Sequence, residues 1–173
     1  TSVDQFVFAN GTVWGLPEIE SRVRTFVGSE ASESLFGSIN DDTLLGLGGN
    51  DQIRASLGND TLQGGMGNDF LEGFSGNDVY VFGLGDGQDF IDEQGDASDV
   101  DTLQLVEGIT QADVRLHATP DFGSDAILTI NSTTDQVTLG GFFSFDSLRV
   151  DRIQFSDGTI WDYSAMLAHT EGV

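Results

Sequence analysis

A repeat of nine residues constrains the fold of this chain more than any other feature of its sequence. From Gly37 to Val81 the chain divides without a gap into five frames of nine residues. The sixth place of every frame is aspartate: Asp42, Asp51, Asp60, Asp69 and Asp78. The fourth place is small or turn-forming: Asn40, Gly49, Gly58, Gly67 and Gly76. The eighth place is large and apolar: Leu44, Ile53, Leu62, Leu71 and Tyr80. A fixed period of this kind indicates a solenoid.

Two frames with weaker matches flank these five. The frame before them, Gly28–Phe36, carries Glu33 in the aspartate place. The frame after them, Leu84–Asp92, follows an insertion of two residues and carries Gly87 and Asp89 at the corresponding places. We therefore expect the repeat region to cover residues 28–93.

Each place of the frame suits one part of a coil. Glycine and asparagine tolerate positive backbone φ angles, so the first six residues of a frame can form a tight turn. The last three residues can form a short strand whose eighth-place side chain points into the core. Two frames then make one full coil, and turns two frames apart stack on one edge at about 4.8 Å, the strand spacing. The repeat predicts an all-β fold, a parallel β-roll.

The acidic residues of stacked turns are predicted to bind calcium. They form two rows, which are Asp42, Asp60 and Asp78 on one edge and Glu33, Asp51, Asp69 and Asp89 on the other. Calcium takes oxygen ligands at about 2.3–2.6 Å, so carboxylates from two stacked turns can reach one ion between them. Carbonyl groups of the turns are expected to complete the sites, which therefore include Asn40, Gly49, Gly58, Gly67 and Gly76.

We expect three to five calcium ions. The strongest pairs are Asp42/Asp60, Asp60/Asp78 and Asp51/Asp69, and the weaker ones are Glu33/Asp51 and Asp69/Asp89. Because Asp60 serves two strong pairs, its replacement by alanine should be the most damaging single change. The alternative is that these aspartates only cap turns, as Asx turns do without metal. A row of like charges at strand spacing disfavours that alternative, because the charges repel one another without a cation.

Composition excludes several functions. The chain has 29 acidic and 6 basic residues, and its net charge of −23 disfavours nucleic acid and anionic membranes as partners. Every basic residue is arginine, which excludes a phosphate loop with its lysine and a Schiff-base lysine. The absence of cysteine excludes disulfides and zinc–thiolate sites. An acidic excess this large needs cations to offset it in a compact state.

These repeats resemble the calcium-binding nonapeptides of repeats-in-toxin (RTX) proteins. The stretch Asp78–Asp89 looks like the usual end of such a roll, and the remainder resembles the trailing domain of haemolysin-type calcium-binding proteins. The matching segments of the remainder are Asp101–Leu103, Ala112–Val114, Gln136–Leu139 and Phe155–Trp161. The resemblance implies a fragment of a large secreted adhesin-like or toxin-like protein. It also implies export unfolded by a type I system from a Gram-negative bacterium, and folding on extracellular calcium.

A second, longer repeat relates the two ends of the chain. Val3–Trp14 aligns without gaps to Val150–Trp161, at an offset of 147 residues. We infer tandem modules of about that length in the parent protein, so that neighbouring modules are partners. Both copies predict two strands joined by a tight turn and followed by a helix, at Leu16–Phe26 and at Tyr163–Ala168 with Asp162 as its cap.

The expected organisation has three parts. Residues 1–27 are the tail of a preceding module, residues 28–93 the roll, and residues 94–173 a β-rich cap that covers its end. The strands expected in the cap are Asp101–Val106, Val114–His117, Ala126–Asn131, Gln136–Leu139 and Leu148–Phe155.

No residue pattern predicts catalysis, and we expect the chain not to be an enzyme by itself. His117 and His169 lie in no recognisable metal or triad motif, and no nucleophile elbow is present. The alternative function is a module that binds polysaccharide, a cell surface or a partner through an aromatic platform. Its candidate residues are Phe142, Phe143, Phe145 and Trp161, for which a buried cap core is the favoured interpretation.

Overall fold

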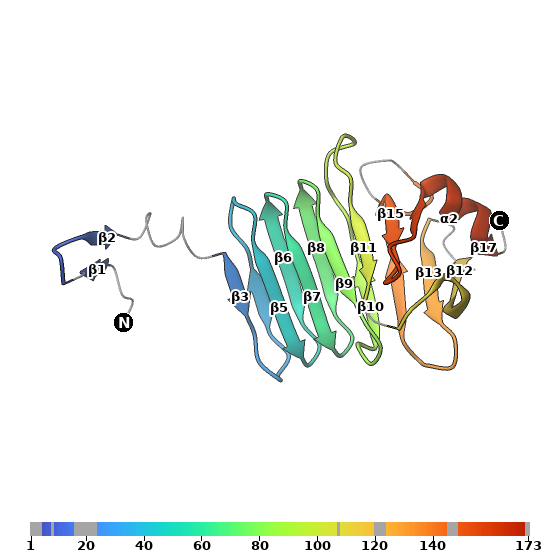
Figure 1. The fold of residues 1–173 in the computed structure, drawn as a ribbon, viewed down its shortest axis with the longest axis horizontal. Helices are drawn as coiled ribbons and strands as arrows, with labels where there is room; N and C mark the ends of the chain where they lie inside the picture. The colour runs from blue at the N-terminus through green and yellow to red at the C-terminus, as the bar shows by residue number, and fades with distance from the viewer. Residues whose placement is uncertain are drawn as a thin grey trace.

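The computed structural model describes residues 5–7, 9–15, 24–106, 108–119, 124–144 and 149–171. The roll is built from two sheets that the chain enters alternately, and within it neighbouring strands of each sheet are parallel (Figure 1). The first sheet receives β3 (Thr25–Val27), β5 (Thr43–Gly48), β7 (Thr61–Met66), β9 (Val79–Phe82) and β11 (Thr102–Leu105). The second sheet receives β4 (Ser34–Phe36), β6 (Gln52–Leu57), β8 (Phe70–Ser75) and β10 (Gln88–Ile91). The predicted parallel β-roll is therefore confirmed.

Strand register gives the length of one coil. Thr43 pairs with Thr61 in the first sheet, and Gln52 pairs with Phe70 in the second, so each coil takes 18 residues. Two nine-residue frames account for that length, as the sequence predicts. In the next layer of the second sheet, Phe90 pairs with Phe70, which gives a step of 20 residues. The insertion of two residues is therefore absorbed between strands, and the inward and outward faces are preserved.

The core of the roll is built from the eighth-place side chains. Leu44, Leu62 and Tyr80 stack in the first sheet, and each is fully buried. Ile53 and Leu71 stack in the second sheet and are equally inaccessible. Full burial of such a side chain contributes about 1.5–3 kcal/mol. The predicted inward direction of the eighth place is confirmed.

The C-terminal half extends both sheets. Its elements are η1 (Gln111–Asp113), β12 (Val114–Ala118), β13 (Ala126–Ile130), β14 (Gln136–Leu139), β15 (Arg152–Gln154), β16 (Ile160–Asp162), α2 (Tyr163–His169) and β17 (Thr170–Glu171). Strand β14 pairs in parallel with β10, and β15 pairs in parallel with β11. The remaining strands continue outward from these two. The exposed edge of each roll sheet is thereby covered on the C-terminal side.

The predicted C-terminal helix is confirmed. The Asp162 side chain accepts a hydrogen bond from the backbone N–H of Ala165, which satisfies one of the free donors at the start of α2. The N-terminal helix expected at Leu16–Phe26 differs. Residues 16–23 lie outside the described residues, and the expectation is wrong for Thr25 and Phe26 because they belong to β3 and pair in parallel with β5.

The two ends of the chain form the same hairpin. Strands β1 (Gln5–Val7) and β2 (Val13–Gly15) are antiparallel and pair Val7 with Val13. Strands β15 and β16 pair Gln154 with Ile160, which are the same two positions shifted by 147 residues. In the described part of the chain β1 and β2 pair only with each other, and Val7 and Val13 are 65% and 50% exposed. The described helices include none with the length and apolar character needed to cross a bilayer.

Candidate calcium sites

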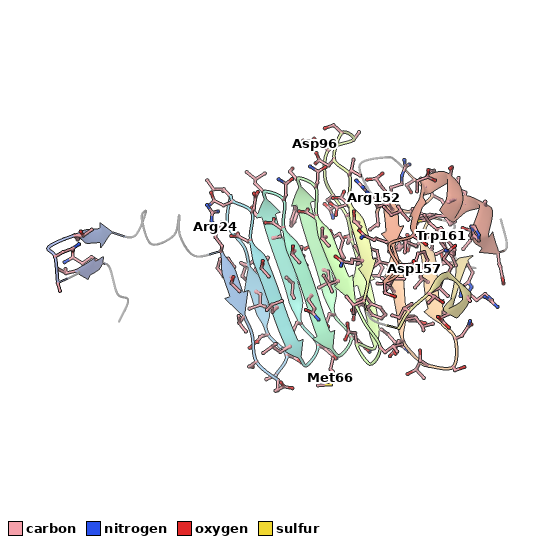
Figure 2. All side chains as sticks on the ribbon, viewed as in Figure 1. Arg24, Met66, Asp96, Arg152, Asp157 and Trp161 are labelled. Atoms are coloured by element: carbon pink, nitrogen blue, oxygen red, sulfur yellow. The ribbon has the colours of Figure 1, made fainter. Side chains whose placement is uncertain are left out.

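The turns of the roll lie along two opposite edges. Figure 2 marks these edges, with Asp96 in the loop between β10 and β11 at one and Met66 at the end of β7 at the other. The edge of Asp96 also carries the turns that lead into β5, β7 and β9. Each edge brings together one predicted row of acidic residues.

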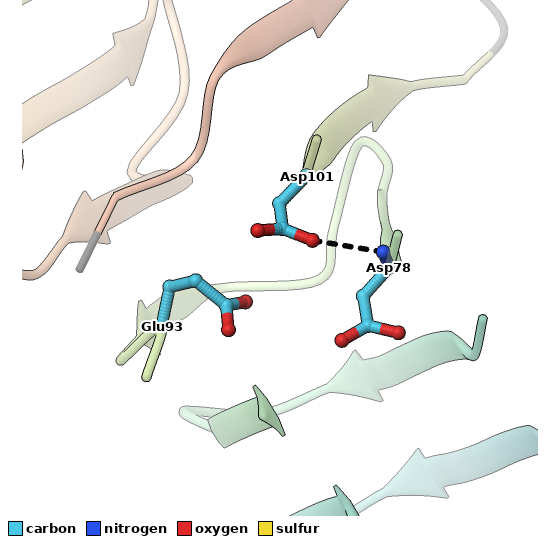
Figure 3. Close-up of side chains that lie close together, drawn as sticks. All are labelled: Asp78, Glu93 and Asp101. Atoms are coloured by element: carbon cyan, nitrogen blue, oxygen red, sulfur yellow. Dashed lines mark hydrogen bonds between the residues drawn. The ribbon is translucent and has the colours of Figure 1, made fainter. Parts of the chain in front are cut away.

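On the Asp96 edge the aspartates form a continuous hydrogen-bonded row. The backbone N–H of Asp42 donates to Oδ1 of Asp60 at 2.7 Å, and the N–H of Asp60 donates to Oδ1 of Asp78 at 2.8 Å. The N–H of Asp78 donates in turn to Oδ1 of Asp101 at 2.8 Å (Figure 3). One oxygen of each upper carboxylate thus joins two layers of the roll.

The opposite edge repeats this arrangement. The N–H of Glu33 donates to Oδ1 of Asp51 at 2.9 Å, and the N–H of Asp51 donates to Oδ1 of Asp69 at 2.7 Å. The N–H of Asp69 donates to Oδ1 of Asp89 at 3.0 Å. The structure therefore places every predicted pair in adjacent layers, including the two pairs that involve Glu33 and Asp89.

The second oxygen of most of these carboxylates is buried without a hydrogen-bond partner. Five such oxygens occur in the described residues: Oδ1 of Asp42 and Oδ2 of Asp51, Asp60, Asp69 and Asp78. A buried charged oxygen without a partner costs several kcal/mol. The pattern therefore requires either protons or a cation between the layers.

First-place glycines leave space beside these oxygens. A Cβ atom on Gly46 would lie 2.4 Å from Oδ2 of Asp51 and 2.4 Å from the carbonyl oxygen of Gly64. A Cβ atom on Gly64 would lie 2.2 Å from Oδ2 of Asp69. Carboxylate and carbonyl oxygens thus converge where a side chain is missing. This all-oxygen donor set suits calcium, and it suits zinc or copper poorly.

Fourth-place residues have a different environment from the one expected. Gly58, Gly67 and Gly76 have φ angles of 120°, 149° and 127°, and the fourth-place Gly49 has a φ angle of 98°. The carbonyl oxygen of Gly58 lies 1.7 Å from the position that a Cβ atom on Gly76 would take. These glycines therefore let successive turns stack closely. A ligand role for them and for Asn40 stays a prediction, because the carbonyl groups near the free carboxylate oxygens belong to the first place.

Four residues that the sequence argument missed belong to the row on the Asp96 edge. Asp101 lies above Asp78, and its backbone N–H donates to Oδ2 of Asp151 at 3.0 Å. The Nε of Arg149 lies 3.6 Å from Oδ1 of Asp151, so a guanidinium group ends the row. Glu93 is 1% exposed and lies beside Asp78 and Asp101. Asp101 had a visible signal, because the Asp-Thr-Leu that begins there also begins at residues 42 and 60.

Burial and mutual repulsion raise the pKa values of these carboxyl groups. Burial raises the pKa of Asp60 and Asp69 to about 6. Hydrogen bonds from the backbone oppose this increase, and neighbouring carboxylates add to it. The same causes raise the pKa of Asp78 to about 7 and that of Asp89 to about 8. Burial and the nearby carboxylate of Asp101 raise the pKa of Glu93 to about 8. Asp78, Asp89 and Glu93 are therefore fully charged at neutral pH only if a cation compensates them.

The aromatic residues of the cap do not form one open platform. Phe142 is fully buried, Trp161 is 6% exposed, and Phe143 is half-buried. The Phe142 ring packs against Phe143 and Tyr163, and Trp161 packs against Phe155. Phe145 lies outside the described residues. Phe142 and Trp161 therefore contribute to the core of the cap.

Comparison with known proteins agrees with this geometry. The family model for the RTX calcium-binding nonapeptide repeat matches residues 27–62 and 54–89. The model for the haemolysin-type calcium binding protein related domain matches residues 125–165. No curated protein sequence matches the chain.

Two similar solved structures are subunits of the mannuronan C5-epimerase of Azotobacter vinelandii. The AlgE6R3 subunit is 26% identical, with a TM-score of 0.50, and the match covers 69% of this chain and 76% of that one. The AlgE6R2 subunit is 22% identical, with a TM-score of 0.53, and the match covers 78% of this chain and 94% of that one. The second similarity concerns the fold alone. With its matched repeats, stacked aspartates and trailing domain, the chain belongs to the RTX calcium-binding nonapeptide-repeat proteins and carries a haemolysin-type calcium binding protein related domain.

Proposed function

We propose that this chain is a structural module of a large secreted bacterial RTX protein, and that it folds when calcium binds between the layers of its roll. The observation that supports the proposal is the set of five buried carboxylate oxygens without hydrogen-bond partners, stacked along the two edges. The proposed ions, three to five in number, lie between Asp42 and Asp60, between Asp60 and Asp78, and between the paired residues of the opposite edge. The module needs no catalytic residue for this role.

The mechanism couples binding to folding. The unfolded chain has no preformed site, so the binding free energy of each ion adds directly to the free energy of unfolding. Extracellular calcium modules commonly bind with dissociation constants of about 10⁻⁴ to 10⁻³ M. A chain with such sites stays unfolded at cytosolic calcium concentrations and folds outside the cell. RTX repeats are typical of secreted proteins, which supports export before folding.

Tandem modules explain the N-terminal hairpin. Strands β1 and β2 have the register of β15 and β16, and in the cap that hairpin is attached to β11 through β15. Strands β3 and β11 pair in parallel with strands of the roll, so we shift the bounds expected from the sequence. We assign residues 1–24 to the tail of a preceding module, residues 25–105 to the roll and residues 106–173 to its cap. Neighbouring modules of the same chain are then its partners, and the exposed Val7 and Val13 belong to a surface that such a module covers.

A second candidate role is a module that positions an exported protein on polysaccharide. The similarity to the AlgE6R3 subunit, which belongs to an epimerase named for mannuronan, favours it. The burial of Phe142 and Trp161 disfavours a sugar platform built on those rings. The calcium-folded structural module remains the better supported role.

A calcium titration tests the proposed function directly. In chelator we expect a far-UV circular dichroism spectrum of a largely disordered chain, because the stacked carboxylates repel one another. Adding calcium from zero to about 10 mM, a range that spans the affinities of extracellular modules, should produce a cooperative gain of β signal. Magnesium should not replace calcium, because it requires a smaller, octahedral site. A spectrum that is already β-rich in chelator would contradict the proposal.

Acid should partly replace calcium. The pKa values of Asp60, Asp78 and Asp89 are about 6, 7 and 8 in the folded chain, against about 4 in an unfolded one. At pH values between the unfolded and the folded pKa, these three groups bind more protons in the folded state. Their contribution to stability is therefore fully present below about pH 4 and is lost as the pH rises through 6 to 8. In chelator at constant ionic strength, lowering the pH from about 8 to about 5 should increase the β signal. An unchanged spectrum would show that these carboxyl groups do not control folding.

A further inference from the structure

One position on the Asp96 edge departs from the small residues of its column. The register of β4, β6, β8 and β10 stacks the first-place residues Gly37, Ala55 and Gly73 beneath Glu93. The first three have at most one side-chain carbon. Glu93 instead places a carboxylate at the top of the column, beside the aspartates of the same edge, and only 1% of it is exposed.

A second departure accompanies the first. Tyr80 occupies the eighth place of its frame, where the other four frames have leucine or isoleucine. Its fully buried hydroxyl donates a hydrogen bond to Oε2 of Glu93 and accepts one from the backbone N–H of Gly73 at 2.8 Å. The hydroxyl therefore holds the Glu93 carboxylate in one position.

Three buried carboxylates converge in this layer. Asp78, Glu93 and Asp101 each offer one oxygen, and these oxygens lie within 4.8 Å of one another (Figure 3). Two oxygens bound to one calcium ion at about 2.3–2.6 Å cannot lie more than about 5 Å apart, so the spacing fits a single ion. Asp78 is fully buried, and its Oδ2 has no hydrogen-bond partner. That oxygen lies 2.2 Å from the position of a Cβ atom on Gly73, and the Tyr80 hydroxyl lies 2.6 Å from the same point.

We propose that Asp78, Glu93 and Asp101 form a terminal calcium site at the junction of the roll and the cap, with Tyr80 as a positioning residue. The inference rests on the proposed calcium-folded module. Three carboxylates surround this site, whereas two stacked acidic residues form each lower step, so it binds calcium more tightly than the others. In the layer above this site, the guanidinium group of Arg149 lies beside the Asp151 carboxylate and supplies the positive charge in place of an ion.

The terminal site connects separate parts of the chain. Asp78 precedes β9, Glu93 follows β10, and Asp101 precedes β11. Strand β11 pairs with β15 of the cap, so an ion at this site fixes the layer on which the cap is built. Binding at this step should therefore order the cap together with the last coil of the roll.

Isothermal titration of the full chain with calcium tests the site. Glu93→Gln keeps the size of the side chain and removes one charge, and we expect it to weaken the tightest step about tenfold or more, or to abolish it. The matched control is Asp92→Asn, which removes one charge from the neighbouring residue outside the cluster and should leave every step unchanged. If wild type binds calcium and Glu93→Gln gives the same isotherm as wild type, the terminal site is wrong while the proposed function stands. If wild type binds no calcium, both are wrong.

Terbium luminescence decides the question if Glu93→Gln does not fold. Terbium binds oxygen sites in place of calcium and emits when a nearby phenol transfers excitation energy to it. Tyr80 adjoins the proposed site, so Tyr80→Phe should remove most of the tyrosine-sensitised emission, and Tyr163→Phe should leave it unchanged. Equal emission from wild type and Tyr80→Phe would overturn the terminal site.

Discussion

Replacing Asp60 with alanine is expected to remove much of the calcium-dependent stability of the roll. Asp60 is 1% exposed, its Oδ1 accepts from the N–H of Asp42, and its Oδ2 has no hydrogen-bond partner. The residue therefore contributes to the step below it and to the step shared with Asp78. At calcium concentrations ten to a hundred times the dissociation constant, each lost site lowers the free energy of unfolding by about 1.4–2.7 kcal/mol. Urea unfolding in calcium should show a total loss of about 3–5 kcal/mol.

A turn-capping aspartate provides the control. The side chain of Asp157 accepts a hydrogen bond from the N–H of Thr159 at 2.9 Å, in an exposed turn between β15 and β16, and Asp157 belongs to neither row. Asp157→Ala should cost about 1 kcal/mol, the usual value of a single hydrogen bond, at any calcium concentration. If Asp60→Ala costs no more than Asp157→Ala, the aspartates of the roll only cap turns. The structure also changes the expected ranking, because Asp78 contributes to the step shared with Asp60 and to the tighter terminal site with Asp101, so its replacement should be at least as damaging.

Replacing Gly76 with alanine should destabilise the roll by about 3–5 kcal/mol, through two separate effects. Its φ angle is 127°, a conformation that L residues rarely adopt. A Cβ atom would lie 1.7 Å from the carbonyl oxygen of Gly58 in the turn below, so the two turns could not stack at strand spacing. The calcium midpoint of the β signal should rise, because the layers on either side must separate to accept the methyl group.

A control substitution at Gly85 separates the cost of the backbone conformation from the cost of the clash between stacked turns. Gly85 has a φ angle of 92°, and a Cβ atom added there would meet nothing within 4 Å. Gly85→Ala should therefore cost only the backbone term, about 1–2 kcal/mol. Denaturant unfolding of both variants in saturating calcium gives the difference, which measures the clash between stacked turns. Equal losses for Gly76→Ala and Gly85→Ala would show that the turns separate without cost.

The similarity of successive frames is what made the roll predictable from sequence. A residue such as Ile53 or Leu71 recurs at the same place of every frame, and a strand buries that place whatever lies beyond the roll. The pairing of Asp51 with Asp69 follows from the same period, because two frames close one coil. The hairpin at Val150–Trp161 was visible for a related reason, since its copy occurs at Val3–Trp14.

Residues outside the nine-residue period required the tertiary structure. Asp101 lies 23 residues after Asp78, and Asp151 lies 50 residues after Asp101, so no fixed step leads from one to the next. Glu93 has no counterpart at the first place of any regular frame, and its contact with Tyr80 depends on the stacking of two sheets. The N-terminal residues of β3 looked helical because nothing local to them reveals the strand β5 that they pair with.

The sequence by itself therefore determined the parallel β-roll, its 18-residue coil, its buried column and its two rows of stacked acids. Each of these depends on interactions whose spacing along the chain is constant. The tertiary structure decided where the rows end, which backbone oxygens face the carboxylates, and which side chains close the last layer. Those features depend on loops of unequal length, and only strand pairing across the two sheets brings their residues to the same edge.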